Sequence, residues 1–410
     1  MTDRPNLLFL CQTLPYPPDG GVWIRSYHVL RLLSRAFRVT ALCFERTGIS
    51  GRRHPCDPGT AIEALRPFAQ VEALPIPQTR SSVRFLWDHL RSTVSRRVYT
   101  RYLYESPGFR ARLGELLRTR RFDLVHVDSL DLSGYLPVCL GLPTVCVHHN
   151  VESVLLRRRG EVEGNAVSRH YYAYQARLME QEERHWVPQV SLNVVVSEPD
   201  LQALRRITPA GRFCVVPNGV DVEEFAPGGF EGEAVVYIGG TNWFPNLDAL
   251  EFFCQGILPR LRERGFKAPV RWVGSASDEE RRRFARLGVE LTGYVEDVRP
   301  FMHESFCHIV PLRSGGGTRL KILNSWAVGK PVVSTSVGCE GLRAVDGENI
   351  LIRDDAAGFA EAILALSRDA ELRKRLGEAG RRTAVEAYSW DAIGDAMIRS
   401  YTALLSEAPS

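Results

Sequence analysis

Short apolar runs alternate with longer stretches of helical periodicity through the first half of this chain. Apolar runs bounded by turn residues indicate buried strands, and apolar residues three or four positions apart indicate helices that cover a sheet. Strands that alternate with helices predict βαβ units and a parallel sheet. The predicted strands are 6–12, 38–44, 123–127, 143–149 and 192–197, and the clearest helices are about 22–36 and 152–186.

A second alternation of the same kind begins near residue 233. The segment from 213 to 233 is rich in glycine, proline and acidic residues, which predicts a last strand followed by a linker. The strands expected in the second half are 234–240, 270–274, 306–312 and 330–335, and the helices are about 247–264, 278–286, 318–328 and 356–367.

Two α/β domains are expected, because 410 residues exceed what one hydrophobic core usually holds. We predict an N-terminal Rossmann-like domain over 1–212 and a C-terminal Rossmann-like domain over 213–388. A last helix within 389–410 is expected to pack back on the first domain. Ligands of open α/β folds bind at the carboxyl ends of the strands. We therefore expect a binding cleft between the carboxyl ends of the two sheets.

Composition is that of an ordinary globular protein, with 44% hydrophobic and 24% charged residues. No stretch approaches the roughly 18 uninterrupted apolar residues of a membrane span, and the first apolar run is too short for a signal peptide. We therefore expect a cytoplasmic protein. The nine cysteines are scattered without a CxxC pair, so they are predicted to be reduced and structural.

The net charge of +4 is too small to indicate a nucleic-acid partner, and none is expected. Positive charge is concentrated in residues 80–121, where eleven arginines stand against three acidic residues and are interleaved with aromatic side chains. Such a segment can contact an anionic membrane at the inner face or bind an anionic substrate. It can equally be the solvated surface of an arginine-rich chain, and both interpretations stay open.

A pair of glycines, Gly20 and Gly21, separates the first strand from its helix. Without side chains, these residues let a phosphate approach the backbone N–H groups at the helix N-terminus, where the helix dipole also favours an anion. The alternative is an ordinary βα turn after a proline-rich stretch.

A second glycine-rich loop runs from Ser314 into a helix and carries two cations, Arg319 and Lys321. Positive charge in the first helical turn opposes the helix dipole, so these cations call for an anion. A departing diphosphate would fill that role, stabilised by cations and amides without a metal. The alternative is a pair of solvent-facing charges on a surface helix. Arg313 is a weaker third candidate.

Several strings now agree in order and spacing: PYPPDGG, VHHNVES, VVPNGVDVEEF, GYVEDVRPFM and PLRSGGGTRLKILNSWAVGKPVVST. Together they resemble the GT-B glycosyltransferases of family 4, retaining enzymes that use nucleotide-sugar donors. The resemblance implies two Rossmann-like domains facing across a cleft. It also implies transfer of a sugar to an unidentified acceptor in polysaccharide, glycolipid or glycoconjugate biosynthesis, with no cofactor and no metal.

The resemblance also implies roles for individual residues. His149 would lie against the transferred sugar and act with Arg319 and Lys321 as the catalytic group, although a histidine at a strand end is often a packing residue. The first-turn acid Glu152 could bind the sugar or the acceptor, and the PNGVD turn at 217–221 could contact the donor, but a structural role is favoured for both. The donor phosphates would meet Gly20, Gly21, Gly240, Thr241, Gly315, Gly316, Gly317 and Thr318, and the nucleoside would meet Asn324, Tyr294 and Val295.

Two positions and one segment depart from the family pattern. Gly316 and Asn324 stand where the family commonly has glutamates that contact the donor sugar and the ribose, and TNWFPN follows residue 240 where basic residues are typical. Two other functions therefore stay open: a non-catalytic nucleotide-sugar-binding partner of another transferase, and a nucleotide-sugar epimerase of the same architecture. An NAD-dependent dehydrogenase is disfavoured, because no GxGxxG follows a strand.

Overall fold

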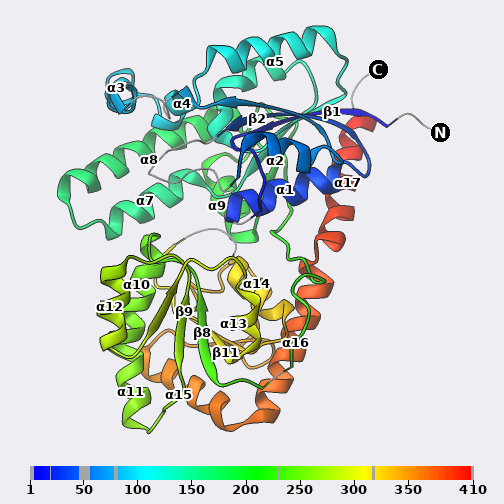
Figure 1. The fold of residues 1–410 in the computed structure, drawn as a ribbon. Helices are drawn as coiled ribbons and strands as arrows, with labels where there is room; N and C mark the ends of the chain where they lie inside the picture. The colour runs from blue at the N-terminus through cyan, green and yellow to red at the C-terminus, as the bar shows by residue number, and fades with distance from the viewer. Residues whose placement is uncertain are drawn as a thin grey trace. The chain divides into compact units, whose positions relative to one another are not determined.

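The computed structural model describes residues 4–18, 20–45, 56–77, 82–229, 231–315 and 319–407 (Figure 1). The chain divides into two compact units. Unit 1 comprises Met1–Pro217 and Gly394–Ser410, and unit 2 comprises Asn218–Ile393. The boundary between the units therefore falls after Pro217, within the PNGVD turn, whereas the expected boundary followed residue 212.

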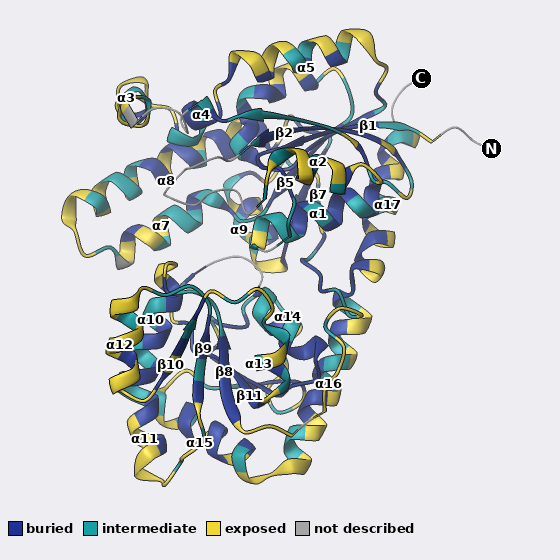
Figure 2. Ribbon diagram, viewed as in Figure 1, coloured by how far each residue is buried: buried dark blue, intermediate teal, exposed yellow. Residues whose placement is uncertain are grey.

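Unit 1 is built on a seven-stranded parallel sheet with the order β3-β2-β1-β4-β5-β6-β7. The central strands are almost wholly buried, since helices cover both faces of the sheet (Figure 2). All five predicted strands are present, and β3 is an addition that the sequence pattern did not indicate. The strands are β1 Asn6–Cys11, β2 Arg38–Glu45, β3 Gln70–Pro75, β4 Leu124–Val127, β5 Thr144–His148, β6 Leu192–Val195 and β7 Phe213–Val215.

One helix of unit 1 differs from the helix expected from the sequence. The single helix expected over 152–186 is two helices, because the chain breaks at 163–165 and Asn165 caps the second one by accepting from the N–H groups of Val167 and Ser168. The helices are α1 Gly21–Leu33, α2 Pro58–Leu65, α3 Ser82–Ser95, α4 Tyr99–Leu103, α5 Pro107–Thr119, the 3₁₀ helix η3 Leu130–Tyr135, α6 Leu136–Cys139, α7 Glu152–Val162, α8 Ala166–Trp186 and α9 Glu198–Ile207.

Unit 2 holds a six-stranded sheet with the order β10-β9-β8-β11-β12-β13, all neighbours parallel. Its core stacks Trp272 on Tyr237 at 3.7 Å and also buries Trp326. The strands are β8 Ala234–Ile238, β9 Val270–Val273, β10 Glu290–Gly293, β11 Ser305–Val310, β12 Val332–Ser334 and β13 Leu351–Ile352.

One helix of unit 2 begins later than expected, and its first residues belong to the candidate site. The helix expected over 318–328 begins at Leu320, so Arg319 stands at its N-cap and Lys321 is its second residue. The helices are α10 Phe244–Phe252, the π-helix η4 Phe253–Ile257, α11 Leu258–Glu263, α12 Asp278–Arg286, α13 Arg299–His303, α14 Leu320–Ala327, α15 Ala356–Arg368, α16 Ala370–Tyr388 and α17 Trp390–Glu407, which continues into unit 1 from Gly394.

The described residues also answer the questions of disulfide bonds, membrane-spanning helices and metal sites. All nine cysteines are described and free, and seven of them are buried. Across the described ranges, no helix combines the length and the apolar character that crossing a bilayer requires. The same ranges contain no group of three or more His, Cys, Asp and Glu residues arranged to hold a metal ion.

Candidate functional site

The turn after β8 forms the first part of the candidate site in unit 2. Gly239 donates its N–H to the carbonyl of Val273 at 2.8 Å, and Asn246, at the start of α10, donates from Nδ2 to the carbonyl of Gly240 at 2.8 Å. These bonds hold the glycine turn against the carboxyl ends of β8 and β9. Thr241 is almost fully buried, and its hydroxyl donates to Glu280 Oε2 at 3.0 Å. Its hydroxyl is thus engaged within the unit.

Lys321 reaches this turn from α14. Its Nζ donates to the Tyr237 hydroxyl at 2.5 Å and to Asn246 Oδ1 at 3.0 Å, and it lies 4.1 Å from the centre of the Tyr237 ring. The same Nζ is 3.1 Å from the place that a Cβ at Gly239 would occupy. The structure therefore brings the Lys321 amine against the predicted glycine turn, although about 80 residues separate them.

The electrostatics of Lys321 follow from these neighbours. The hydrogen-bond partners of Nζ are neutral oxygens. Burial lowers the pKa of Lys321 well below its usual range, and the nearby Arg319 lowers it further. An anion that arrives beside Nζ would oppose both effects and favour the protonated amine.

Arg319 lies beside the second glycine loop. Only 7% of its surface is exposed, and its Nη2 donates to the carbonyl of Val337 at 3.2 Å. Its Nη1 is 3.1 Å from where a Cβ at Gly315 would stand, and Gly315 has φ +122°, a conformation that favours glycine. The other three predicted loop residues, Gly316, Gly317 and Thr318, lie outside the described residues.

Arg313, the weaker sequence candidate, has a different role. Its guanidinium forms a bidentate ion pair with Asp248 and lies 4.9 Å from the centre of the Phe252 ring. This exposed pair ties the loop after β11 to α10. Because Arg313 already has a carboxylate partner, it is a weaker phosphate candidate than Lys321, and a role at the phosphates stays a prediction.

The predicted nucleoside residues lie at two places in unit 2. Tyr294 and Val295 directly follow β10; the Tyr294 side chain is 70% exposed, whereas Val295 packs against the small cluster of Ala234, Val236 and Val273. Asn324 lies on α14, three residues after Lys321, with its side chain partly exposed. Their contacts with a nucleoside stay predictions.

In unit 1, the glycine pair opens α1 as expected. Gly20 is the N-cap and Gly21 the first helical residue, and the N-cap residue itself has no side chain with which to cap the helix. The Trp23 ring lies 2.7 Å from where a Cβ at Gly20 would stand, and Trp23 Nε1 donates to Thr13 Oγ1 at 2.5 Å. The missing side chain at Gly20 is thus needed for packing, and its approach to a phosphate stays a prediction.

His149 follows the last residue of β5 and meets a carboxylate that the sequence analysis did not select. Its Nε2 lies 3.5 Å from Asp128 Oδ2. Asp128 follows β4 and is fully buried, and it also accepts from Ser26 Oγ and contacts His126 Nε2 at 3.2 Å. Because β4 and β5 are neighbouring parallel strands, their carboxyl ends bring Asp128 and His149 together.

Charge in this cluster favours an ionised Asp128. Burial alone would raise its pKa, but the adjacent His149 and His126 outweigh burial and hold the pKa well below the usual range. His148 takes a different partner, Asn193 Oδ1 at 3.0 Å, and burial lowers its pKa to about 4. The string HVDS contained the available signal, an acid directly after a buried strand at the same sheet edge as His149.

The residues given structural roles have structural partners. Glu152 begins α7 and accepts from Asn150 Nδ2 at 3.2 Å, and burial raises its pKa to about 8. Asp221 accepts from the N–H groups of the next turn, while Val220 donates to the carbonyl of Tyr388 at 2.8 Å. The PNGVD turn is thereby tied to the end of α16.

Two parallel α/β units, each with glycine turns and polar side chains at the carboxyl ends of its strands, define the GT-B class of protein. The family described as Glycosyltransferase Family 4 matches residues 19–224, half of the chain, and the one described as Glycosyl transferases group 1 matches residues 232–369. The chain belongs to glycosyltransferase family 4.

Solved structures share this fold. Sucrose-phosphate synthase from Thermosynechococcus elongatus superposes with a TM-score of 0.72 at 18% identity, covering 98% of this chain and 100% of that one. Anabaena Alr3699/HepE in complex with UDP superposes with a TM-score of 0.65 at 14% identity, covering 97% and 100%. At such identities the likeness concerns the fold alone.

Curated relatives match over shorter segments. The lipopolysaccharide core biosynthesis glycosyltransferase LpsE of Rhizobium meliloti is 40% identical over 123 residues, 30% of this chain and 35% of that protein. A D-inositol 3-phosphate glycosyltransferase of Geodermatophilus obscurus is 30% identical over 227 residues, 48% of each. The chain thus spans between a third and a half of the length of these relatives.

Proposed function

We propose that this protein is a retaining glycosyltransferase that moves a sugar from a nucleotide-diphosphate sugar to an acceptor in polysaccharide, glycolipid or glycoconjugate biosynthesis. The observation that carries the proposal is the position of Lys321, whose Nζ lies against the glycine turn after β8 and whose hydrogen-bond partners among the described residues are neutral. Membership of a glycosyltransferase family supports the same reaction class.

The chemistry at Lys321 follows from charge. Breaking the bond between the sugar and the phosphate leaves negative charge on the departing diphosphate. A fixed amine, the Arg319 guanidinium and backbone N–H groups of the glycine turns would stabilise that charge in the transition state. We propose that these groups act without a metal.

In unit 1, His149 would lie against the transferred sugar. Asp128 contacts His149 and stays ionised, so it restricts the orientation of the imidazole beside the transferred sugar. Asp128 would act as a positioning residue, because it is fully buried and reaches the substrate only through its neighbours.

A uridine nucleotide is the first donor to test. One fold neighbour was solved with UDP and with UDP-glucose. In this chain Asn324 would meet the ribose with an amide in place of the family's carboxylate, so we expect weaker donor binding than a glutamate would provide.

The test compares Lys321→Met with Arg313→Ala, a cation from the neighbouring loop that is already paired with Asp248. With the wild type, UDP, GDP or ADP should raise the melting temperature by mass action, and donor turnover should be measurable. We expect Lys321→Met to abolish the nucleotide-induced shift and lower turnover about 100-fold or more, while Arg313→Ala keeps both. Normal turnover in a folded Lys321→Met protein would refute the assignment.

A second function is favoured by Gly316 and Asn324, which replace the two family glutamates. A non-catalytic binding partner would show the nucleotide-induced shift but neither transfer nor donor hydrolysis. The third possible function is a nucleotide-sugar epimerase. An epimerase would invert a carbon of the donor sugar without any acceptor, and NMR of the donor would detect that change.

A further inference from the structure

Helix α3 is amphipathic, but its apolar face points away from the protein. Val83, Leu86, Trp87, Leu90 and Val94 recur at the three- and four-residue spacing of one helical face, and their exposed fractions lie between 53% and 77%. On the opposite face, Asp88 and Ser92 are fully buried. An ordinary surface helix has the reverse arrangement.

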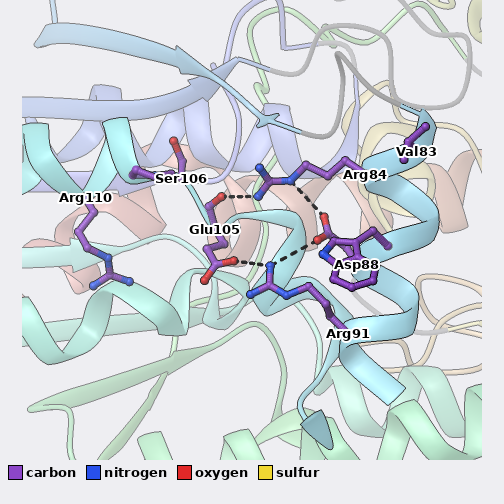
Figure 3. Close-up of a pocket in the computed structure, with 9 residues that line it drawn as sticks. Val83, Arg84, Asp88, Arg91, Glu105, Ser106 and Arg110 are labelled. Atoms are coloured by element: carbon purple, nitrogen blue, oxygen red, sulfur yellow. Dashed lines mark hydrogen bonds and ion pairs between the residues drawn. The ribbon is translucent and has the colours of Figure 1, made fainter. Parts of the chain in front are cut away.

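Polar contacts hold α3 in this orientation. Ser92 accepts from Gln175 Nε2 of α8 at 2.8 Å and donates to the carbonyl of Arg97 at 2.7 Å. Asp88 pairs within the helix with Arg84 at 3.4 Å, and Arg91 binds Glu105 at 2.8 Å (Figure 3). Turning the helix inward would leave buried polar groups without partners, so the outward apolar face is a property of the folded unit.

This face concentrates the apolar surface of the molecule. Of the fifteen exposed large apolar residues in the described chain, five form this face and a sixth, Phe85, lies elsewhere on α3, whereas the others are spread over several elements. Single exposed apolar residues are normal, but a contiguous stripe marks an interaction surface. In Figure 2, α3 is largely exposed and stands apart from the sheet of unit 1.

Charge around the stripe indicates the partner. Residues 82–97 contain four arginines and one acid, the buried Asp88, and Arg96 and Arg97 are exposed at the end of the helix. A second copy of the chain would bring two basic rims together, which is unfavourable. An anionic bilayer attracts such a rim, and its interface accommodates Trp87.

A groove beside the stripe adds to the match with a lipid surface. It measures about 670 Å³, lies between α3 and the start of α5, and has Arg84, Arg91 and Arg110 on its walls (Figure 3). Asp88 and Glu105 also line it, so the groove keeps an excess of one positive charge, three arginines less two acids. It offers room for a lipid headgroup next to the apolar stripe.

We infer that α3 docks this protein on an anionic membrane surface, with Val83, Leu86, Trp87, Leu90 and Val94 in the bilayer interface and the arginines against lipid phosphates. Interfacial helices with basic flanks bind in this way. None of these residues belongs to the set proposed for donor binding, so the inference can be tested independently of sugar transfer. Arg80, which the basic segment also includes, lies outside the described residues.

Flotation with lipid vesicles tests the inference on the full chain. Wild-type protein should float with vesicles that contain phosphatidylglycerol and remain unbound with phosphatidylcholine alone, and salt should weaken the binding. Leu90→Glu should reduce binding about tenfold or more, since a buried leucine contributes roughly 1.5–3 kcal/mol. The matched control is Leu287→Glu, an exposed leucine of unit 2, which should bind as the wild type does.

Arginine variants separate lipid binding from loss of fold. Arg96→Gln should weaken binding to anionic vesicles about fivefold, the equivalent of about 1 kcal/mol for one arginine near the surface, with an unchanged melting temperature. Three outcomes would overturn the inference: no flotation of the wild type with anionic vesicles, equal flotation of wild type and folded Leu90→Glu, or a wild-type dimer that Leu90→Glu converts to a monomer.

Discussion

Single residues after strand ends carry the candidate chemistry. Asp128 and His149 follow neighbouring strands of unit 1, while Gly239 follows β8 in unit 2 and meets Lys321 from α14. Parallel strands end at one edge of a sheet, so residues distant in sequence become neighbours there. His149, Arg319 and Lys321 could be selected from local strings. For Asp128 the string HVDS shows only an acid directly after a strand, and the importance of that acid depends on which strand lies beside β5.

Replacing Asp128 by asparagine tests its positioning role. Asp128→Asn keeps the volume but removes the charge that faces His149 and His126. We expect kcat to fall at least about tenfold, equal to about 1.4 kcal/mol of barrier, with the donor KM little changed. Steady-state kinetics with an unfolding control measure this. The control is Asp248→Asn, at an exposed ion pair of unit 2, which should leave kcat and KM unchanged. An unchanged kcat in Asp128→Asn as well would show that the Asp128 carboxylate has no part in catalysis.

Lys321 also predicts how nucleotide affinity depends on pH. Burial and Arg319 lower its pKa in the free protein, whereas a bound diphosphate favours the charged amine. Binding should therefore take up a proton, and affinity should decrease as the pH rises through the lowered pKa. Calorimetric titration of UDP in buffers of different ionisation enthalpy measures the proton uptake. Lys321→Met should abolish it, and an unchanged uptake in that variant would contradict the prediction.

At the scale of elements, one helix ends where the apolar periodicity does not predict an end, and acidic side chains are buried on two helices. The predicted helix over 152–186 breaks where Asn165 caps α8, a signal that the apolar periodicity alone does not contain. Glu183 of α8 is buried and accepts from the N–H of Ser153 at 3.1 Å on α7. Burial raises the pKa of Glu183 to about 7 and that of Glu152 to about 8.

These two acids should make unfolding pH-dependent. Between about pH 4.5 and pH 7 the folded protein keeps the Glu183 proton that the unfolded chain releases, so the free energy of unfolding should decrease as the pH rises, and Glu152 should extend the decrease to about pH 8. Glu183→Gln should remove about 3 kcal/mol of this dependence over the full interval. Urea unfolding at several pH values measures it.

The control for Glu183 lies one turn earlier on the same helix. Glu180 is ion-paired with Arg184 and Arg157, and these partners lower its pKa. Glu180→Gln should therefore leave the slope between pH 5 and pH 8 unchanged. An equal slope in wild type and Glu183→Gln would show that Glu183 does not cause it.

At the scale of the whole molecule, each unit is held together by its own core and by buried polar anchors. Lys330 is the clearest anchor in unit 2. It is fully buried, and its Nζ donates to the carbonyls of Glu231, His303 and Ser305 at 2.7–3.0 Å. The lysine of the GKPVV string, which supported the family resemblance, thus has a structural role, because these bonds tie the segment before β8 to the start of β11.

Lys330→Met should destabilise unit 2 strongly. The substitution leaves three carbonyl groups without their donor, which costs about 3 kcal/mol or more. Hydrogen exchange should accelerate in β8 and β11. Lys267→Met, at an exposed position of the same unit, is the matched control and should exchange like the wild type. Equal protection in both variants would rule out the anchoring role.

The sequence by itself determined the parallel α/β architecture, two units, the family and the glycine turns, because these depend on local periodicity and short strings. It missed β3, β10 and β13, all at sheet edges, where strands are short or partly exposed and lack a continuous apolar run. Only the tertiary structure decided that Lys321 meets Gly239, that Asp128 meets His149 and that α3 faces outward. Those contacts depend on sheet order and on polar anchors between distant segments, which no local pattern encodes.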